Sequence, residues 1–184
     1  MSALTGGAMA AMQTVTDDIS RRIMSLRVLI VDDEAEMRRV TRALLQSIGV
    51  TDVHEAKDGF SGLDATCSLK PDIILLDWEM PKPNGPEFVQ IVRSPGQFPL
   101  PDVPIIMVTG SSERSRVVEA IRSGINEYLL KPVSTTALLA RVVYILTKPR
   151  RMVTLDNRYV PEPRKLSTYK PEYDPAFDEF LLNR

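Results

Sequence analysis

Acidic side chains mark two points in the sequence at which a strand is expected to end. Asp32, Asp33 and Glu34 follow the apolar run RVLIV, and Asp77 follows IILL. In an open parallel sheet, ligands bind at the carboxyl ends of the strands. Carboxylates at such a place are costly to desolvate unless a cation meets them. The acids therefore predict a site for a cation at this edge of the sheet.

Two further polar residues follow later apolar runs, namely Thr109 after IIMV and Lys131 after YLL. Asp32, Asp33 and Asp77 would repel one another unless a hard divalent cation neutralised them, and oxygen ligands of this kind suit Mg²⁺. A lysine ammonium and a threonine hydroxyl supply a cation and a donor for phosphoryl oxygens. The set predicts phosphoryl chemistry, with Asp77 as the nucleophile that forms an acyl phosphate.

Five repeats of a strand followed by a helix must position these residues, and they predict an α/β fold with a parallel sheet covered on both sides. The strands are expected at 27–31, 52–56, 73–76, 103–108 and 127–130, from short apolar runs. The helices are expected at 35–48, 59–69 and 86–93, then from Ser111 or Ser112 to Gly124, and from Ser134 to Thr147.

Apolar spacing also predicts which faces of the first two helices point to the core. The predicted core residues are Met37, Val40, Leu44 and Ile48 in the first helix, and Phe60, Leu63 and Cys67 in the second. Cys67 is the only cysteine, which excludes a disulfide framework, and we interpret it as a core thiol. The arginines of the first helix are interpreted as solvated, with no special role.

Composition limits the classes of function. The chain has 184 residues, enough for one domain and appendages, and its net charge of −1 argues against a DNA-binding protein. Its apolar runs are too short to cross a membrane, so we expect a soluble, cytoplasmic protein with no membrane partner. Residues 1–25 are expected to be a flexible or loosely helical leader.

The strings DDEAEMRR, DWEMPKPNG, VTG and LLKP, in this order and spacing, resemble the receiver domain of two-component response regulators. The resemblance covers 26–147. It implies a flavodoxin-like, doubly wound sheet with strand order 2-1-3-4-5. It also implies that Asp77 accepts a phosphoryl group from the phosphohistidine of a sensor histidine kinase. Such a protein is a phosphoacceptor that promotes its own phosphorylation and dephosphorylation, and is not otherwise an enzyme.

The resemblance assigns roles in metal binding by position. Asp33, Asp77 and the backbone carbonyl of Glu79 would bind Mg²⁺, and Asp32 would hold a metal-bound water. The Glu79 side chain either lies near the phosphoryl group and changes its lifetime, or simply faces solvent. Kinase preference would depend on the first helix and on the loop after the fifth strand, including Met37, Arg38 and Val133.

The resemblance also assigns roles in switching. Lys131 would pair with the phosphoryl group, and Thr109 would move to hydrogen-bond it. Tyr128 would then swing inward as the switch aromatic, and Pro132 would follow a cis peptide bond. The helix before the fifth strand, that strand and the last helix would form the partner surface.

A haloacid-dehalogenase-type phosphatase is the alternative, because that family also uses a strand-end aspartate and Mg²⁺. It requires a second aspartate two residues beyond the nucleophile, where this chain has Glu79, and it places the nucleophile on the first strand. Turnover of a small phosphate ester would favour the phosphatase. Stoichiometric labelling by acetyl phosphate would favour the receiver.

The C-terminal extension, 148–184, is too short for a DNA-binding output domain, so we expect a single-domain regulator. We expect it to pass phosphoryl groups in a phosphorelay, or a conformational signal, to a downstream protein partner. The extension is rich in proline and carries five aromatic residues, Tyr159, Tyr169, Tyr173, Phe177 and Phe180. Two hypotheses remain open: an arm that exchanges between chains in a homodimer, or docking on its own helices.

Overall fold

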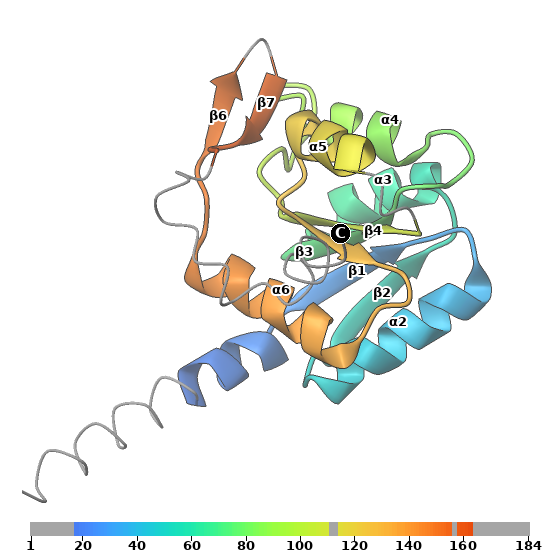
Figure 1. Cartoon of the computed structure of the whole chain (residues 1–184), viewed down its shortest axis with the longest axis vertical. Coiled ribbons are helices and arrows are strands. Elements are labelled where there is room, and N and C mark those ends of the chain that lie inside the picture. The colour runs from blue at the N-terminus through green and yellow to red at the C-terminus, as the bar shows by residue number, and fades with distance from the viewer. Residues whose placement is uncertain (1–16, 111–113, 156–157, 164–184) are drawn as a thin grey trace, which may run out of the picture.

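The computed structural model describes residues 17–110, 114–155 and 158–163. A five-stranded sheet lies at its centre, with the order β2-β1-β3-β4-β5 and parallel pairing throughout (Figure 1). This order confirms the doubly wound topology. The strands are β1 (Arg27–Val31), β2 (Asp52–Ala56), β3 (Ile73–Asp77), β4 (Ile105–Thr109) and β5 (Glu127–Leu130).

Strand β4 begins later than the apolar run predicts. The run starts at Val103, but the strand starts at Ile105, because Pro104 has no N–H with which to join the ladder. Val103 is nevertheless buried. At its other end β4 includes Thr109, and β3 includes Asp77, so both polar residues belong to the strands that they end.

Helices cover both faces of the sheet (Figure 1). On one side lie α3 (Gly59–Leu69), α4 (Gly85–Val92) and α5 (Arg114–Ser123), and on the other lie α2 (Ala35–Ser47) and α6 (Thr135–Thr147). Side-chain caps begin three of the described helices: the Asp58 side chain accepts from the backbone N–H of Ser61, Asn84 from that of Glu87, and Ser134 from that of Ala137. The predicted helices are present, with described ends that differ by a few residues. The expected cap at Ser111 or Ser112 lies outside the described residues.

The core has two layers because successive residues of a strand point to opposite faces. Ile74 and Leu76 of β3 belong to the layer under α3, α4 and α5, whereas Ile73 and Leu75 belong to the layer under α2 and α6. All five residues of β3 are buried. A central parallel strand covered on both faces explains this continuous apolar run.

The predicted core faces of α2 and α3 are partly wrong. In α2 the buried residues are Thr41 and Leu45, whereas Val40 is 46% exposed. In α3, Phe60 is 68% exposed. Cys67 is also exposed, so it is not a core thiol.

Phe60 and Cys67 of α3 are exposed because this helix lies very close to the sheet. The helix packs through Gly59, Gly62 and Thr66, all buried. A Cβ atom on Gly62 would lie 2.8 Å from Cγ1 of Val31. Small residues therefore face the sheet most closely, Leu63 packs at the edge of the core, and Phe60 and Cys67 are left on the outer side. Hydrophobic spacing alone does not indicate this.

The expected boundary of the leader also differs. Residues 17–24 form a helix, and Ile23 and Leu26 are buried in the core layer of α2 and α6. The guanidinium of Arg22 donates to the carbonyl oxygen of Leu146 at the end of α6, at 2.8 Å. Residues 17–25 therefore pack on the domain; residues 1–16, the rest of the expected leader, lie outside the described residues.

The first part of the C-terminal extension forms an antiparallel hairpin of β6 (Met152–Leu155) and β7 (Arg158–Pro161). The hairpin lies beside α5 (Figure 1), and Val160 is buried. The Tyr159 hydroxyl donates to the Asp102 carboxylate at 2.5 Å. Docking on its own chain thus describes this part of the extension. Tyr169, Tyr173, Phe177 and Phe180 lie outside the described residues.

No helix among the described residues combines the length and apolar character that crossing a membrane requires.

Candidate functional site

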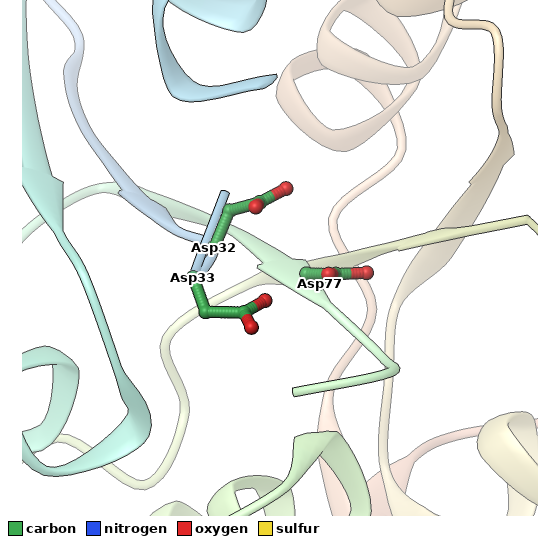
Figure 2. A group of neighbouring side chains, drawn as sticks. All are labelled: Asp32, Asp33 and Asp77. Atoms are coloured by element: carbon green, nitrogen blue, oxygen red, sulfur yellow. The ribbon is translucent and has the colours of Figure 1, made fainter. Parts of the chain in front are cut away.

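Three aspartates meet at the carboxyl edge of the sheet, as predicted. Asp32 and Asp33 follow β1, and Asp77 ends the neighbouring strand β3 (Figure 2). Each contributes a carboxylate oxygen to a group in which all the oxygens lie within 4.8 Å of one another. Asp32 and Asp77 are buried, whereas Asp33 is exposed and opens the group to solvent. Adjacent parallel strands bring the three residues together.

Lys131 reaches this group from the end of β5. Its Nζ atom lies 3.2 Å from Oδ1 of Asp77 and 3.4 Å from Oδ2 of Asp32. The Lys131 side chain is 18% exposed, so it is more shielded from water than a surface lysine. The sequence prediction that Lys131 and Asp77 lie together is correct in geometry.

The charges in the group are unbalanced. Burial raises the pKa of Asp77, and the Asp32 carboxylate adds to this effect, whereas the Lys131 ammonium opposes it. Burial lowers the pKa of Lys131, but the Asp77 and Asp32 carboxylates outweigh burial and raise it overall. The Lys131 ammonium therefore stays charged, but its single positive charge does not neutralise the three carboxylates. An additional cation would stabilise the group.

This donor set fits a hard divalent cation. Carboxylate oxygens are the ligands that Mg²⁺ prefers, with water at its other positions. Oδ1 of Asp32 accepts from the backbone N–H of Glu34 at 2.8 Å, and Oδ1 of Asp77 accepts weakly from that of Glu79 at 3.4 Å. These bonds orient both carboxylates. The Glu79 side chain is exposed, and the role of its backbone carbonyl stays a prediction.

Thr109 lies on the same edge, one strand from Asp77. In the ladder Asp77 pairs with Val108, and Thr109 is the next residue and is buried. Its carbonyl oxygen accepts from the backbone N–H of Lys131 at 2.8 Å. Strands β3, β4 and β5 thus bring the carboxylate, hydroxyl and ammonium to one edge, as the sequence predicts.

Tyr128 lies inward in this structure and is only 8% exposed. The guanidinium of Arg141 on α6 lies over its ring, 5.9 Å from the centroid, and donates to its carbonyl oxygen at 3.1 Å. Arg141 also pairs with Glu127 at 3.7 Å, and both side chains are buried. The switching role of Tyr128 stays a prediction. The Lys131–Pro132 peptide bond is cis, which confirms that prediction.

The sequence analysis missed a cluster of ion pairs next to the three aspartates. Arg38 and Arg42 of α2 both pair with Glu55 of β2, and Arg38 also donates to the carbonyl oxygen of Asp32. The signal was present as two arginines four residues apart, on one helix face, with an acid at the end of the next strand. Arg38 is therefore not the solvated residue that we expected.

Residues 28–143 match the response regulator receiver domain family. The chain belongs to this family. Chemotaxis protein CheY1 of Helicobacter pylori is 35% identical over 124 residues, which cover 66% of this chain and 97% of that protein. Chemotaxis protein CheY of Pseudomonas aeruginosa is 33% identical over 123 residues, covering 67% and 98%.

The solved structure of the Francisella response regulator 1452 receiver domain has a similar fold. Its TM-score is 0.60 at 28% identity, and the match covers 67% of this chain and all of that one. The receiver domain therefore accounts for the five-stranded sheet and its helices. The helix at 17–24 and the β6–β7 hairpin lie outside the 28–143 match.

Proposed function

We propose that this receiver domain accepts a phosphoryl group from a sensor histidine kinase on Asp77, with Mg²⁺ as cofactor. One observation carries the proposal. The carboxylate oxygens of Asp32, Asp33 and Asp77 lie within 4.8 Å of one another, and Lys131 lies 3.2 Å from Asp77. A site with excess negative charge and one cation is suited to Mg²⁺ and a phosphoryl group.

The transfer is a displacement at phosphorus. A carboxylate oxygen of Asp77 attacks the phosphorus of the phosphohistidine, the P–N bond breaks, and its electron pair stays on the imidazole nitrogen. Mg²⁺, held by Asp33, Asp77 and the backbone carbonyl of Glu79, with Asp32 on a bound water, would neutralise charge on the carboxylates and the phosphoryl oxygens. Lys131 pairs with a phosphoryl oxygen, and Thr109 donates to another.

The added dianion then changes the surface near β5. Thr109 and Lys131 bind the phosphoryl oxygens only in one arrangement of the strand ends, which biases α5, β5 and α6. Val118, Ile121 and Leu139 on these helices are exposed apolar residues, which supports a protein partner at this face. We expect this partner, or the next protein of a phosphorelay, to be cytoplasmic. We expect no DNA contact.

Labelling by a small donor tests the proposal. Incubation with acetyl phosphate and Mg²⁺ should add one phosphoryl group to the wild type, seen as a single step in intact mass, and none to Asp77→Asn. Asp64→Asn, which changes an exposed acid on α3, should label like the wild type. An unmodified wild type, or equal labelling of Asp77→Asn, would contradict the proposal.

Repeated turnover of a phosphate ester under these conditions would instead favour the phosphatase alternative. Rapid transfer from one sensor kinase of the same genome to the wild type, but not to Asp77→Ala, would identify the donor.

A further inference from the structure

Arg38 hydrogen-bonds the backbone of the turn that carries Asp32 and Asp33. Nη1 of Arg38 donates to the carbonyl oxygen of Asp32 at 2.8 Å, and its Nε pairs with Oε2 of Glu55 at 3.2 Å. The Arg38 side chain is 15% exposed, so its contacts are shielded from water. One guanidinium thus connects the metal-site turn to strand β2.

Glu55 is a fixed anchor for this guanidinium. Its second oxygen, Oε1, pairs with Nε of Arg42 at 2.5 Å, and Nη1 of Arg42 donates to the carbonyl oxygen of Val53 at 2.8 Å. The hydrogen bond from Arg42 holds the pKa of Glu55 below its usual value, despite the opposing effect of burial, and Arg38 adds to the lowering. Glu55 is therefore ionised at neutral pH, and it connects its own strand, β2, to two arginines of α2.

Asp32 is restrained at its main chain and side chain. Its backbone N–H donates to the Ala56 carbonyl at 3.2 Å, its carboxylate accepts from the Glu34 N–H, and its carbonyl accepts from Arg38. The first two restraints come from backbone groups. The third comes from the Arg38 side chain, so a substitution can remove it directly. The Lys131 ammonium also reaches the Asp32 carboxylate, at 3.4 Å, but Lys131 belongs to the site itself.

We propose that Arg38, anchored by Glu55, is a positioning residue that sets the geometry of Asp32 and Asp33 for Mg²⁺. This inference rests on the proposed function. Arg38 does not contact the metal or the phosphoryl group; it acts through the backbone of Asp32. Partners beyond the ligands typically change metal affinity 10–100-fold, and because Arg38 holds a carbonyl and not a ligand atom, its effect is smaller, about 3–10-fold.

A charge effect opposes the positioning effect, so the test must separate them. Removing a cation near the site would by itself strengthen Mg²⁺ binding, whereas losing the restraint weakens it. Arg38→Lys keeps the charge, but a single ammonium lacks the planar fork that reaches both Glu55 and the Asp32 carbonyl. Glu55→Asp keeps the charge of the anchor and shortens it by one methylene group.

The experiment is Mg²⁺ titration of the full chain by calorimetry, with fluorescence of Trp78, the only tryptophan and the neighbour of Asp77, as a second readout. Arg38→Lys and Glu55→Asp should each raise the Kd for Mg²⁺ about 3–10-fold. Arg39→Lys, on an exposed position of the same helix, should leave it unchanged. Thermal unfolding in EDTA and circular dichroism identify variants that fold.

The outcomes are distinguishable. If wild type binds Mg²⁺ and both charge-preserving variants bind it with the same Kd, Arg38 has only a structural role and the inference fails. A lower melting temperature in EDTA with an unchanged Kd leads to the same conclusion. If the wild type itself does not bind Mg²⁺, the proposed function fails, and this inference fails with it.

Discussion

Asp77 is a buried carboxylate whose folded environment disfavours its charge. It is 3% exposed, and burial and Asp32 raise its pKa more strongly than Lys131 lowers it. A carboxyl group with a raised pKa in the folded state destabilises that state at any pH above its unfolded pKa, because the unfolded chain releases the proton more easily. The cost grows with pH until the folded pKa is exceeded. The proposed phosphoacceptor is thus held at a cost to stability, which a bound cation would offset.

Asp77→Asn should therefore stabilise the protein in EDTA at neutral pH. We expect a gain of about 1 kcal/mol, or about 2–4 °C in melting temperature for a chain of this size. The gain should shrink as pH falls toward the ordinary aspartate pKa of 3.8, because wild-type Asp77 becomes protonated there. Thermal unfolding across this pH range is the measurement, with Asp64→Asn as control.

Adding Mg²⁺ should raise the melting temperature of the wild type and have a smaller effect on Asp77→Asn, because a ligand that binds only the folded state stabilises it. A lower melting temperature for Asp77→Asn in EDTA would show that the pairing with Lys131 outweighs burial.

At the scale of an element, helix α3 can lie close to the sheet only because glycine residues face it. A Cβ on Gly62 would lie 2.8 Å from Cγ1 of Val31 and 3.0 Å from Cε2 of Phe88. Both neighbours are fully buried, so they have little room to move. Helix α3 therefore approaches strand β1, which Asp32 follows, to a distance that only glycine permits.

Gly62→Ala should destabilise the protein by up to about 2 kcal/mol. Overpacking a core usually costs about 1–3 kcal/mol, and alanine regains about 1 kcal/mol through its higher helix propensity. Gly110→Ala is the control, since nothing lies within 4 Å of the added Cβ there. Urea unfolding measures both, and a stability of Gly62→Ala equal to the wild type would contradict close packing.

At the scale of the whole molecule, the β6–β7 hairpin joins a region that Arg93 already holds together. Arg93, at the end of α4, is buried and donates to the carbonyl oxygens of Gly124 and Pro101 and to Oδ1 of Asn126. Burial lowers its pKa to about 10, so it stays charged at neutral pH. Arg150 of the extension donates to the Asn126 carbonyl. The extension thus docks where α5 turns into β5.

Deleting residues 150–184 should lower the melting temperature by about 2–4 °C, since it removes the buried Val160 and its contacts at a cost of about 1 kcal/mol. A second truncation, of 164–184, retains the hairpin and isolates its contribution. We expect both truncations to keep the wild-type oligomeric state in light scattering, because the hairpin docks on its own chain. A mass that halves on deletion would contradict this and support an arm exchanged within a homodimer.

The sequence by itself determined the sheet and the edge at which the chemistry gathers. Alternating strands and helices predict a parallel sheet, whereas its strand order came from the resemblance to receiver domains. Parallel strands place Asp32, Asp77, Thr109 and Lys131 at the same edge whatever the side chains between them do. Local spacing carries that information.

Only the tertiary structure decided which helix faces are buried, that Arg38 holds the Asp32 turn, that Tyr128 lies inward, and that the hairpin packs on α5. These features depend on how closely elements distant in sequence approach one another. That distance is set by packing against residues that a single segment does not contain.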